Sequence, residues 1–420
     1  MIIDTVDFSP AQREPAIPIG LPALIKMAFD GVDLPPLWNE LVGRAKDDPN
    51  DAAALMDLSM IAHIQGRPDD RANLQAWALE LQRVYRQPSV DAASESLRVL
   101  AFMAPGDFMA NMPIGFLLEG SNVTLDMVYV VPGSPLPQPL PEHDVALVAV
   151  AESNENQALL EELTALVRSW PRPVVNSPRH IAQLSRDGTW ALLKSAPGIE
   201  IPMNARIDRQ GLERLARGAT LIETVLDGCG FPIIARPIDS HAGEGLCRLE
   251  CGADVDAYLR DRAEPEFYIA PFVDYRGRDG LFRKYRIALI DGRAYAVHMA
   301  ISEHWMIHYL NADMTGSAEK RAEEACFMAD FDEDFAVRHA VALRAIAERC
   351  GLDYIPFDCA ETRDGKLLIF EVGTNMVVHA MDRPDLFPYK QPQMEKVFGA
   401  FQAMLRKRMA HLERIAANAA

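Results

Sequence analysis

Two acidic residues in the last third of the chain, Asp358 and Glu371, have side chains and a spacing suited to metal or phosphate chemistry. They flank Asp364-Gly365, a dipeptide typical of a two-residue type I′ hairpin loop, in which both residues take a positive φ. Counting outward from such a loop places Asp358 directly opposite Glu371, with Cβ atoms roughly 5 Å apart. The other face of the hairpin is predicted to join the core through Phe357, Cys359, Phe370 and Val372.

Two carboxylates that face each other repel, so the pair is destabilising by itself. A sequence tolerates the pair when a cation lies between the groups, or when one carboxyl stays protonated. Oxygen ligands without histidine or cysteine nearby suit Mg²⁺ or Mn²⁺, and Asn375 offers a further oxygen just past the second strand. The alternative is a solvated hairpin face whose charges point outward.

Basic residues and a glycine-containing loop precede this hairpin. Arg236 ends an apolar strand-like segment, and the next loop has backbone N–H groups that could surround phosphates. The loop residues of interest are Ser240, Gly243 and Gly245. The loop lacks the GK[ST] of a P-loop, and a strand rather than a helix follows it. Further on, Lys284 and Arg286 share one face of a strand that enters a second hairpin signal, Asp291-Gly292.

The elements that must position these residues fall into four predicted segments. Residues 1–95 have helical periodicity, and residues 96–180 alternate apolar strands with helices, as in a small open α/β domain with parallel strands. Residues 181–273 contain the glycine loop, and residues 274–420 contain the carboxylate hairpin and a C-terminal helix. One stretch of the first segment resembles a tetratricopeptide unit, but one unit is too few for a solenoid, and a plain helical bundle is slightly preferred. Either would offer a surface for a protein partner or a dimer.

Composition excludes several functions. The chain has 420 residues and a net charge of −18, which disfavours binding to nucleic acid. The N-terminus has no basic region followed by an apolar run, so we expect no signal peptide. No apolar stretch is long enough for a membrane span. The six cysteines show no CxxC spacing, so they are interpreted as reduced thiols of a cytoplasmic protein.

The order of these features resembles the ATP-grasp superfamily. It runs from a strand ending in a cation, through a small glycine loop and a cationic hairpin, to a helix and a carboxylate hairpin. The resemblance is greatest to the branch of ribosomal-protein glutamate ligases and glutathione synthetases, and it covers residues 174–400, with residues 96–173 matching the domain that precedes the grasp. It implies an α/β (α+β) fold, namely an ATP-grasp fold preceded by a small open α/β domain and an α-helical region.

The resemblance also implies roles for individual residues. Lys284 and Arg286 would be catalytic, near the γ-phosphate and the carboxylate substrate. Asp358, Glu371 and Asn375 would bind Mg²⁺ or Mn²⁺. The residues assigned to ATP itself are Arg236 and the loop Ser240, Gly243 and Gly245 for the phosphates, Ile269, Ala270 and Pro271 for adenine, Asp274 for ribose, and Asn311. Arg236 replaces a lysine, and its planar fork implies a different geometry.

Two departures from the family pattern leave two hypotheses open. Gly188 stands where the family has its first lysine, with Lys194 later, and Asn375 lies two positions beyond its usual place after Glu371. The first hypothesis is an ATP-dependent carboxylate–amine ligase that acts through an acyl phosphate, on an amino acid or peptide. The second is a catalytically weak ATP-binding module whose helical region recruits a partner; a thiol or hydroxyl acceptor is a third. Histidines that could line the acceptor pocket, or be structural, are His298, His308 and His379.

Overall fold

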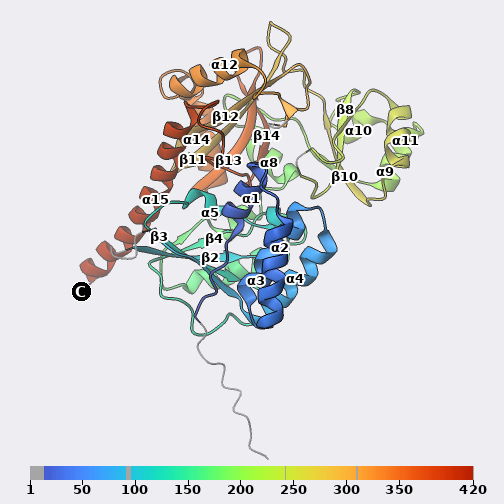
Figure 1. The fold of residues 1–420 in the computed structure, drawn as a ribbon. Helices are drawn as coiled ribbons and strands as arrows, with labels where there is room; N and C mark the ends of the chain where they lie inside the picture. Colours follow the sequence, from blue (N-terminus) through green and yellow to red (C-terminus); the bar gives the residue numbers. More distant parts are fainter. Residues whose placement is uncertain (1–13, 91–95, 242, 309–310, 420) are drawn as a thin grey trace, which may run out of the picture. The chain divides into compact units, whose positions relative to one another are not determined.

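The computed structural model describes residues 14–90, 96–241, 243–308 and 311–419 (Figure 1). Contacts divide the chain into two compact units. Unit 1 comprises Met1–Phe108 and Leu118–Val148, and unit 2 comprises Met109–Leu117 and Ala149–Ala420. This grouping is coarser than the four segments predicted from the sequence, which stay predictions.

Unit 1 contains a helical region followed by strands. Its helices are α1 (Leu21–Phe29), α2 (Pro35–Asp47), α3 (Ala52–Ile64) and α4 (Pro68–Leu81), and its strands are β1 (Val84–Gln87), β2 (Leu97–Met103), β3 (Val123–Tyr129) and β4 (Val145–Val148). Strand β2 pairs in parallel with β3 and β4, which confirms the predicted parallel arrangement of these strands, while β1 pairs antiparallel with β3. Strand β1 lies within the segment that the sequence predicted as helical.

A buried carboxylate of helix α3 binds the backbone just before helix α1. Asp57, 1% exposed, accepts hydrogen bonds from the backbone N–H groups of Ile19 and Gly20, at 2.8 and 3.0 Å. Burial raises the pKa of the Asp57 carboxyl to about 6, although these two backbone hydrogen bonds oppose the shift. The helices pack around a core of Leu24, Leu34, Leu41, Ala54, Leu58 and Ile61.

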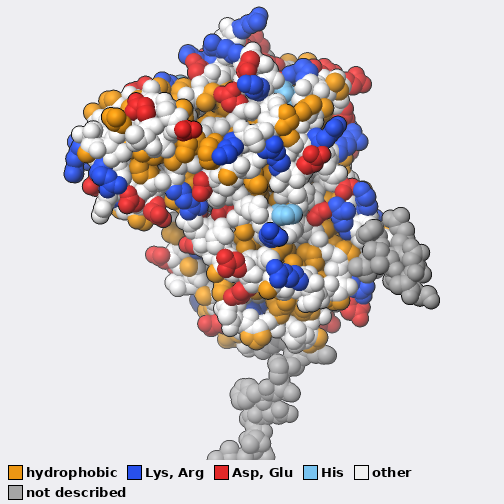
Figure 2. All heavy atoms as spheres, turned by 180° about the vertical axis from the view of Figure 1, so that it is seen from behind, with side chains coloured by type: hydrophobic (Ala, Val, Ile, Leu, Met, Phe, Trp, Pro, Cys, Tyr) orange, Lys and Arg blue, Asp and Glu red, His pale blue; other side chains and the backbone are white. Residues whose placement is uncertain are grey.

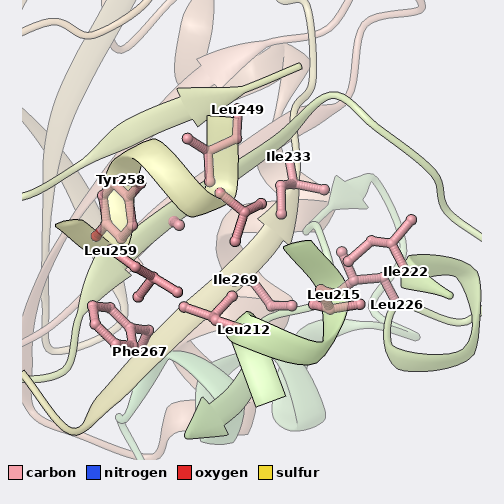
Figure 3. Close-up of a cluster of buried hydrophobic side chains, with 12 residues drawn as sticks. Leu212, Leu215, Ile222, Leu226, Ile233, Leu249, Tyr258, Leu259, Phe267 and Ile269 are labelled. Carbon is pink, nitrogen blue, oxygen red and sulfur yellow. The ribbon is translucent and has the colours of Figure 1, made fainter. Parts of the chain in front are cut away.

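Unit 2 contains a small lobe, residues 205–271, built on a four-stranded antiparallel sheet. The strands are β7 (Ala205–Asp208), β8 (Ile233–Pro237), β9 (Cys247–Leu249) and β10 (Glu266–Pro271), in the order β7-β10-β8-β9, and the helices are α9 (Arg209–Ala216), α10 (Ile222–Val225) and α11 (Gly252–Arg260). Figure 3 shows the apolar side chains of these helices and strands, such as Leu212, Tyr258 and Phe267, packed into one core. This core fixes β8, at whose end Arg236 lies.

The rest of unit 2 is organised on a larger sheet with the order β12-β11-β13-β14-β6. Its strands are β6 (Ile199–Glu200), β11 (Phe282–Ile290), β12 (Arg293–Ser302), β13 (Tyr354–Glu361) and β14 (Leu367–Val372). The remaining elements are α5 (Ile114–Leu117), α6 (Gln157–Leu166), β5 (Val174–Val175), α7 (Pro178–Ile181), α8 (Arg186–Leu193), α12 (Ala318–Ala329), α13 (Phe335–Arg338), α14 (Ala340–Cys350) and α15 (Lys390–Ala419), with the 3-10 turns η1 (Phe108–Ala110) and η2 (Val167–Ser169). Helix α15, red in Figure 1, packs against β11 and β12. The mixed α/β fold class predicted from the sequence is confirmed.

The first of the two predicted hairpins, at Asp291-Gly292, joins β11 to β12. The φ values are 50° at Asp291 and 81° at Gly292, and a type I′ loop requires a positive φ at both positions. Ile290 pairs with Arg293 across the loop. The predicted two-residue hairpin is therefore confirmed here.

The second predicted hairpin, at Asp364-Gly365, has a longer loop than predicted. Of the two residues only Gly365 has a positive φ, 82°, and the backbone N–H of Thr362 donates to the carbonyl of Lys366 at 2.9 Å, so the loop is formed by residues 363–365. The prediction of a two-residue type I′ loop is therefore wrong at this hairpin. Glu361 pairs with Leu367 where the two strands leave the loop.

A β-bulge restores the register that the longer loop displaces. Cys359 pairs with Ile369, but Asp358 pairs with Glu371, so Phe370 is the extra residue on β14. The predicted pairing of Asp358 with Glu371 is confirmed, although its route differs from the one counted from the loop. The other face of the hairpin is buried, as predicted, at Phe357, Cys359 and Val372. Phe370, also predicted to join the core, is only half-buried and contacts the ring of Tyr275.

The surface carries both signs of charge. On the face shown in Figure 2, basic and acidic side chains of the described residues are interspersed rather than gathered by sign. Among the described residues, no helix is long and apolar enough to cross a membrane.

Candidate active site

Asp358 is the best enclosed member of the predicted site. It is 4% exposed, and strand pairing places it opposite Arg286 on β11. The Arg286 guanidinium donates to both carboxylate oxygens, at 2.7 and 3.0 Å, and the Lys284 ammonium donates to Oδ2 at 3.1 Å. Burial by itself would raise the pKa of the Asp358 carboxyl, but the cations of Arg286 and Lys284 outweigh it and hold the pKa far below its ordinary value.

Glu371, opposite Asp358, is paired with a cation that the sequence reasoning missed. Arg186, the first residue of α8, places Nη2 3.0 Å from Oε1 of Glu371 and donates from Nη1 to the carbonyl of Phe370 at 3.2 Å. Burial would raise the pKa of the Glu371 carboxyl, but Arg186 and then Arg236 lower it overall. The signal that could have revealed Arg186 is Ser185, a residue typical of helix N-caps, which makes residue 186 the first of a helix.

The glycine at the position of the expected lysine has a steric cause. A Cβ atom on Gly188 would lie 2.3 Å from the carbonyl oxygen of Gln183 and 2.8 Å from Oγ of Ser185. No side chain fits there without a backbone shift. Lys194, at the end of the same helix, instead holds its ammonium 4.3 Å from the ring centre of Trp190.

Arg236 is a buried cation at the end of β8. It is 8% exposed, and its guanidinium donates to Oγ of Ser240 at 3.0 Å and to the Ser240 carbonyl. In the part of the chain that the structure describes, Arg236 forms no salt bridge. Burial, and then repulsion from Arg186, lower its pKa to about 9, so it stays cationic at neutral pH.

The glycine loop begins beside Arg236. Gly243 and Gly245 have φ values of 81° and 65°, and a Cβ atom on Gly245 would lie 2.5 Å from Cδ of Pro237. The hydroxyl of Tyr258 donates to the Gly245 carbonyl at 2.8 Å. Glycine is therefore required at position 245 both for its backbone conformation and for the close approach of the loop to β8.

The other residues predicted for the ATP site lie at several places in unit 2. Ile269, Ala270 and Pro271 lie on β10, opposite Ala235, Ile234 and Ile233 of β8. Asp274 is held by Arg276 at 2.6 Å, and these hydrogen bonds lower the pKa of its carboxyl to about 2. Asn311 is exposed, and its side chain accepts a hydrogen bond from the backbone of His308 at 3.0 Å. Their roles toward ATP stay predictions.

A pocket of unit 2 lies between the small lobe and the large sheet. It includes predicted residues from both sides, such as Ser240, Glu371 and Asn375, together with Arg186. Its other lining residues are Glu152, Leu184, Thr189, Ile201, Asn204, Asp239, His241, Tyr268, Phe370, Val372 and Gly373. The sequence reasoning did not identify Glu152. Burial raises the pKa of its carboxyl to about 7, although a hydrogen bond from Gln157 opposes the shift.

The three residues predicted as metal ligands do not form a ready metal site in this arrangement. Both oxygens of Asp358 accept hydrogen bonds from cations, and Oε1 of Glu371 is paired with Arg186. Asn375 donates to the carbonyl of Met109 at 3.2 Å. Among the described residues, no group of three or more histidine, cysteine, aspartate or glutamate side chains is placed to hold a metal ion. The oxygen donors have the right chemistry for Mg²⁺, but the carboxylates already bind cations of the chain itself.

Two of the candidate histidines lie close to the paired cations. His298 on β12 pairs with Arg286 across the strands, and burial, followed by Arg286, lowers the pKa of its ring well below the ordinary value. Burial also lowers the pKa of His308, with Lys284 as the next cause. Burial lowers the pKa of His379 to about 4, and its ring lies 6.5 Å from that of Phe116. All three rings are therefore neutral at pH 7.

Comparison with known proteins gives similarity at the level of structure only. No protein-family model matches the chain, and no curated protein matches it in sequence. A D-Ala:D-Ser ligase, VanG, from Enterococcus faecalis is 12% identical with a TM-score of 0.46, over 74% of this chain and 100% of that one. A RimK domain ATP-grasp protein from Sphaerobacter thermophilus is 18% identical with a TM-score of 0.41, over 73% and 99% of the two chains. A D-alanine–D-alanine ligase from Bacillus anthracis, solved with ATP, is 15% identical with a TM-score of 0.40, over 76% and 99%.

Proposed function

We propose that this chain is an ATP-dependent carboxylate–amine ligase that acts through an acyl phosphate. The observation that carries the proposal is a group of four cations, Arg186, Arg236, Lys284 and Arg286, around the opposed carboxylates Asp358 and Glu371. We call these six residues the cation cluster. Phosphoryl transfer depends on positioning and on fixed charge around the phosphate chain, because the protein does little covalent chemistry in that step. The cation cluster, with the glycine loop beside it, supplies that charge.

The reaction would proceed in two steps. A carboxylate oxygen of the first substrate attacks the γ-phosphorus of ATP, the bond from that phosphorus to the β–γ bridging oxygen breaks, and ADP leaves with the electron pair. The amine of the second substrate then attacks the acyl carbon, the phosphate leaves, and the amine loses a proton. The products are an amide, ADP and phosphate, and the cations orient the phosphate groups and stabilise the charge that moves between them.

The residues predicted from the sequence keep their roles as parts of this proposal. Arg236 and the loop residues Ser240, Gly243 and Gly245 would hold the phosphates, and β10 would read adenine through its backbone. Lys284 and Arg286, fixed by Asp358, would act on the transferred group, with an amino acid or peptide as the substrate. Of the oxygen donors that the resemblance implies for Mg²⁺ or Mn²⁺, both oxygens of Asp358 and Oε1 of Glu371 are paired with cations of the chain. A cytoplasmic location stays a prediction.

An ADP-release assay on the purified full-length chain tests this function. ATP is supplied with pooled amino acids and small peptides, and ADP is measured with and without the pool. We expect the pool to stimulate ADP release and amide products to be found by mass spectrometry. ADP release that no carboxylate or amine stimulates would count against a ligase.

The second candidate is an ATP-binding module of low activity whose helical region recruits a partner protein. The observation in its favour is the steric exclusion of any side chain at Gly188, which removes the lysine that the resemblance implies. Nucleotide binding without turnover under every acceptor would support this function. The product separates the third candidate, a thiol or hydroxyl acceptor, from the first, since an amine gives an amide, a thiol gives a thioester and a hydroxyl gives an ester.

A further inference from the structure

The charges of the cation cluster do not balance. Its four cations surround two carboxylates, and this leaves two positive charges in excess. Two of the cations, Lys284 and Arg286, are shared by one carboxylate, Asp358. Glu152 and Asp239, the acidic neighbours in the pocket, form no salt bridge with these cations in the described chain. Positive charge that is withdrawn from water is costly unless an anion compensates it. The cluster is therefore arranged to receive negative charge.

Arg236 shows where that charge is missing. Its guanidinium is 8% exposed and, within the described residues, it hydrogen-bonds only to the hydroxyl and carbonyl of Ser240. Arg186 is close enough to repel it. A guanidinium presents a planar fork of donors that fits two oxygens of one phosphate, and neutral serine oxygens do not supply the charge of that phosphate.

The two ends of the cluster differ in access. The side chains of Lys284, Arg286 and Asp358 are 15%, 19% and 5% exposed, and these residues do not line the pocket. Arg186 is 18% exposed, about as much as Arg286, but it lines the pocket together with Glu371, which is 37% exposed. The ion pair between Arg186 and Glu371 is thus the one that a ligand in the pocket can reach. Among the described residues Arg186 shares no ion pair with Asp358, so a change of its partner would leave the buried pairs of Asp358 intact.

We propose that the cation cluster binds the polyphosphate chain of a nucleotide directly, without a divalent cation as a bridge, and that Arg186 is the residue that changes partner, from Glu371 to the phosphate. This inference rests on the proposed function, because it takes the ligand to be a nucleoside triphosphate. It deepens that function by specifying which form of the ligand the site accepts: the metal-free polyanion.

Isothermal titration calorimetry with sodium tripolyphosphate, in EDTA and low salt, tests the proposal on the full-length chain. Wild type should bind tripolyphosphate in EDTA, and ATP in EDTA should bind within about tenfold of ATP with Mg²⁺, since charge-assisted contacts supply the affinity. Adenosine alone should bind more weakly than ATP. If Mg-ATP binds but neither metal-free polyphosphate does, this inference is overturned and the proposed function stands. If the metal-free polyphosphates bind but no acceptor stimulates ADP release, the inference stands and the proposed function fails.

The same titration with the variant Glu371→Gln is a sharper test, because the two modes of binding predict opposite changes in affinity. The substitution removes one negative charge from the cluster, so metal-free tripolyphosphate should bind at least about threefold tighter, by the Coulomb attraction of the added excess charge. A site that needs a metal bridge on Glu371 requires the opposite, a weaker complex, and that result would overturn the inference. Arg186→Gln should weaken tripolyphosphate binding at least about tenfold, the scale of one charge-assisted hydrogen bond. Lys366→Gln, an exposed cation next to the loop of the same hairpin, is the matched control and should leave binding unchanged.

Discussion

Asp358 and Glu371 occupy paired positions on neighbouring strands, yet their surroundings differ. Asp358 accepts three hydrogen bonds from two cations, and its side chain is 5% exposed. Among the described residues Glu371 has one ion pair, with Arg186, and its side chain is 37% exposed at the wall of the pocket. One end of the pair is thus part of the packed sheet, and the other end faces the pocket. Two carboxylates that are paired across neighbouring strands can therefore have different functions, one stabilising the sheet and the other available to a ligand in the pocket.

The largest effect should come from Asp358→Asn, which removes the buried carboxylate of the pair. The substitution leaves Lys284 and Arg286 buried without a carboxylate, so the free energy of unfolding should fall by about 3–5 kcal/mol. Urea denaturation of the ligand-free protein measures it. The control is Asp332→Asn, which removes the exposed ion-pair partner of Arg293, a residue of β12 in the same sheet. It should change the free energy of unfolding by less than about 1 kcal/mol. Equal losses of unfolding free energy in the two variants would contradict a stabilising role of Asp358 beyond that of an exposed ion pair.

Arg236→Ala should act on binding rather than on folding. Its guanidinium is buried without a carboxylate in the described chain, so the ligand-free protein should lose little stability, while ATP affinity falls by about 1.5–3 kcal/mol. Equilibrium titration with ATP measures the change. Arg248→Ala is the matched control, since Arg248 lies on the adjacent strand β9 and packs over Phe272 at 4.0 Å. A variant at position 236 that binds ATP normally would place Arg236 outside the site.

Glu371→Gln should change the free energy of unfolding by less than about 1 kcal/mol, because one partly exposed ion pair contributes little. The same urea experiment measures it. This result, set against Asp358→Asn, would sharpen the contrast between the enclosed and the accessible end. A loss as large as that of Asp358→Asn would show instead that both carboxylates hold the sheet together.

The last effect is a pH dependence, and it concerns Glu152, a pocket carboxylate that has no ion pair among the described residues. Burial raises the pKa of its carboxyl from 4.5 to about 7 in the folded protein. The protonated form therefore stabilises the fold below pH 4.5, and this contribution is lost as the pH rises through about 7. Glu152→Gln should equal wild type near pH 4.5 and exceed its melting temperature at pH 8. Parallel pH profiles of the two proteins would contradict this.

The sequence alone predicts most strands of the large sheet and the pairing of Asp358 with Glu371, because apolar periodicity and turn residues are local signals. The Asp291-Gly292 hairpin follows its local rule. At Asp364-Gly365 the rule fails, since Thr362 and Lys366 close a longer loop by hydrogen bonds that dipeptide preference does not describe. The bulge at Phe370 compensates for the error.

The partners of the carboxylates could not be predicted, because they depend on strand order and on helix placement. The sequence assigns Lys284 and Arg286 to one face, but their contact with Asp358 arises because β11 lies next to β13. Arg186 escapes prediction because the resemblance points to a lysine at position 188, where the backbone of Gln183 leaves no room for a side chain. The repulsion between the carboxylates is a sound reason to expect cations, but the cations come from the chain itself.

The bulge at Phe370 makes the register of this hairpin tolerant of a change in its length. Residues 359–370 separate the two carboxylates; a two-residue loop would use all of them in regular pairs, whereas the three-residue loop leaves one over, and this residue forms the bulge. A chain that lost Phe370 could keep the same loop and close into a regular ladder, with Asp358 still opposite Glu371. In a regular hairpin of fixed loop, the loss of one strand residue would instead turn the following side chains to the other face of the sheet. Related chains can therefore differ by one residue in this hairpin and still hold the two carboxylates face to face.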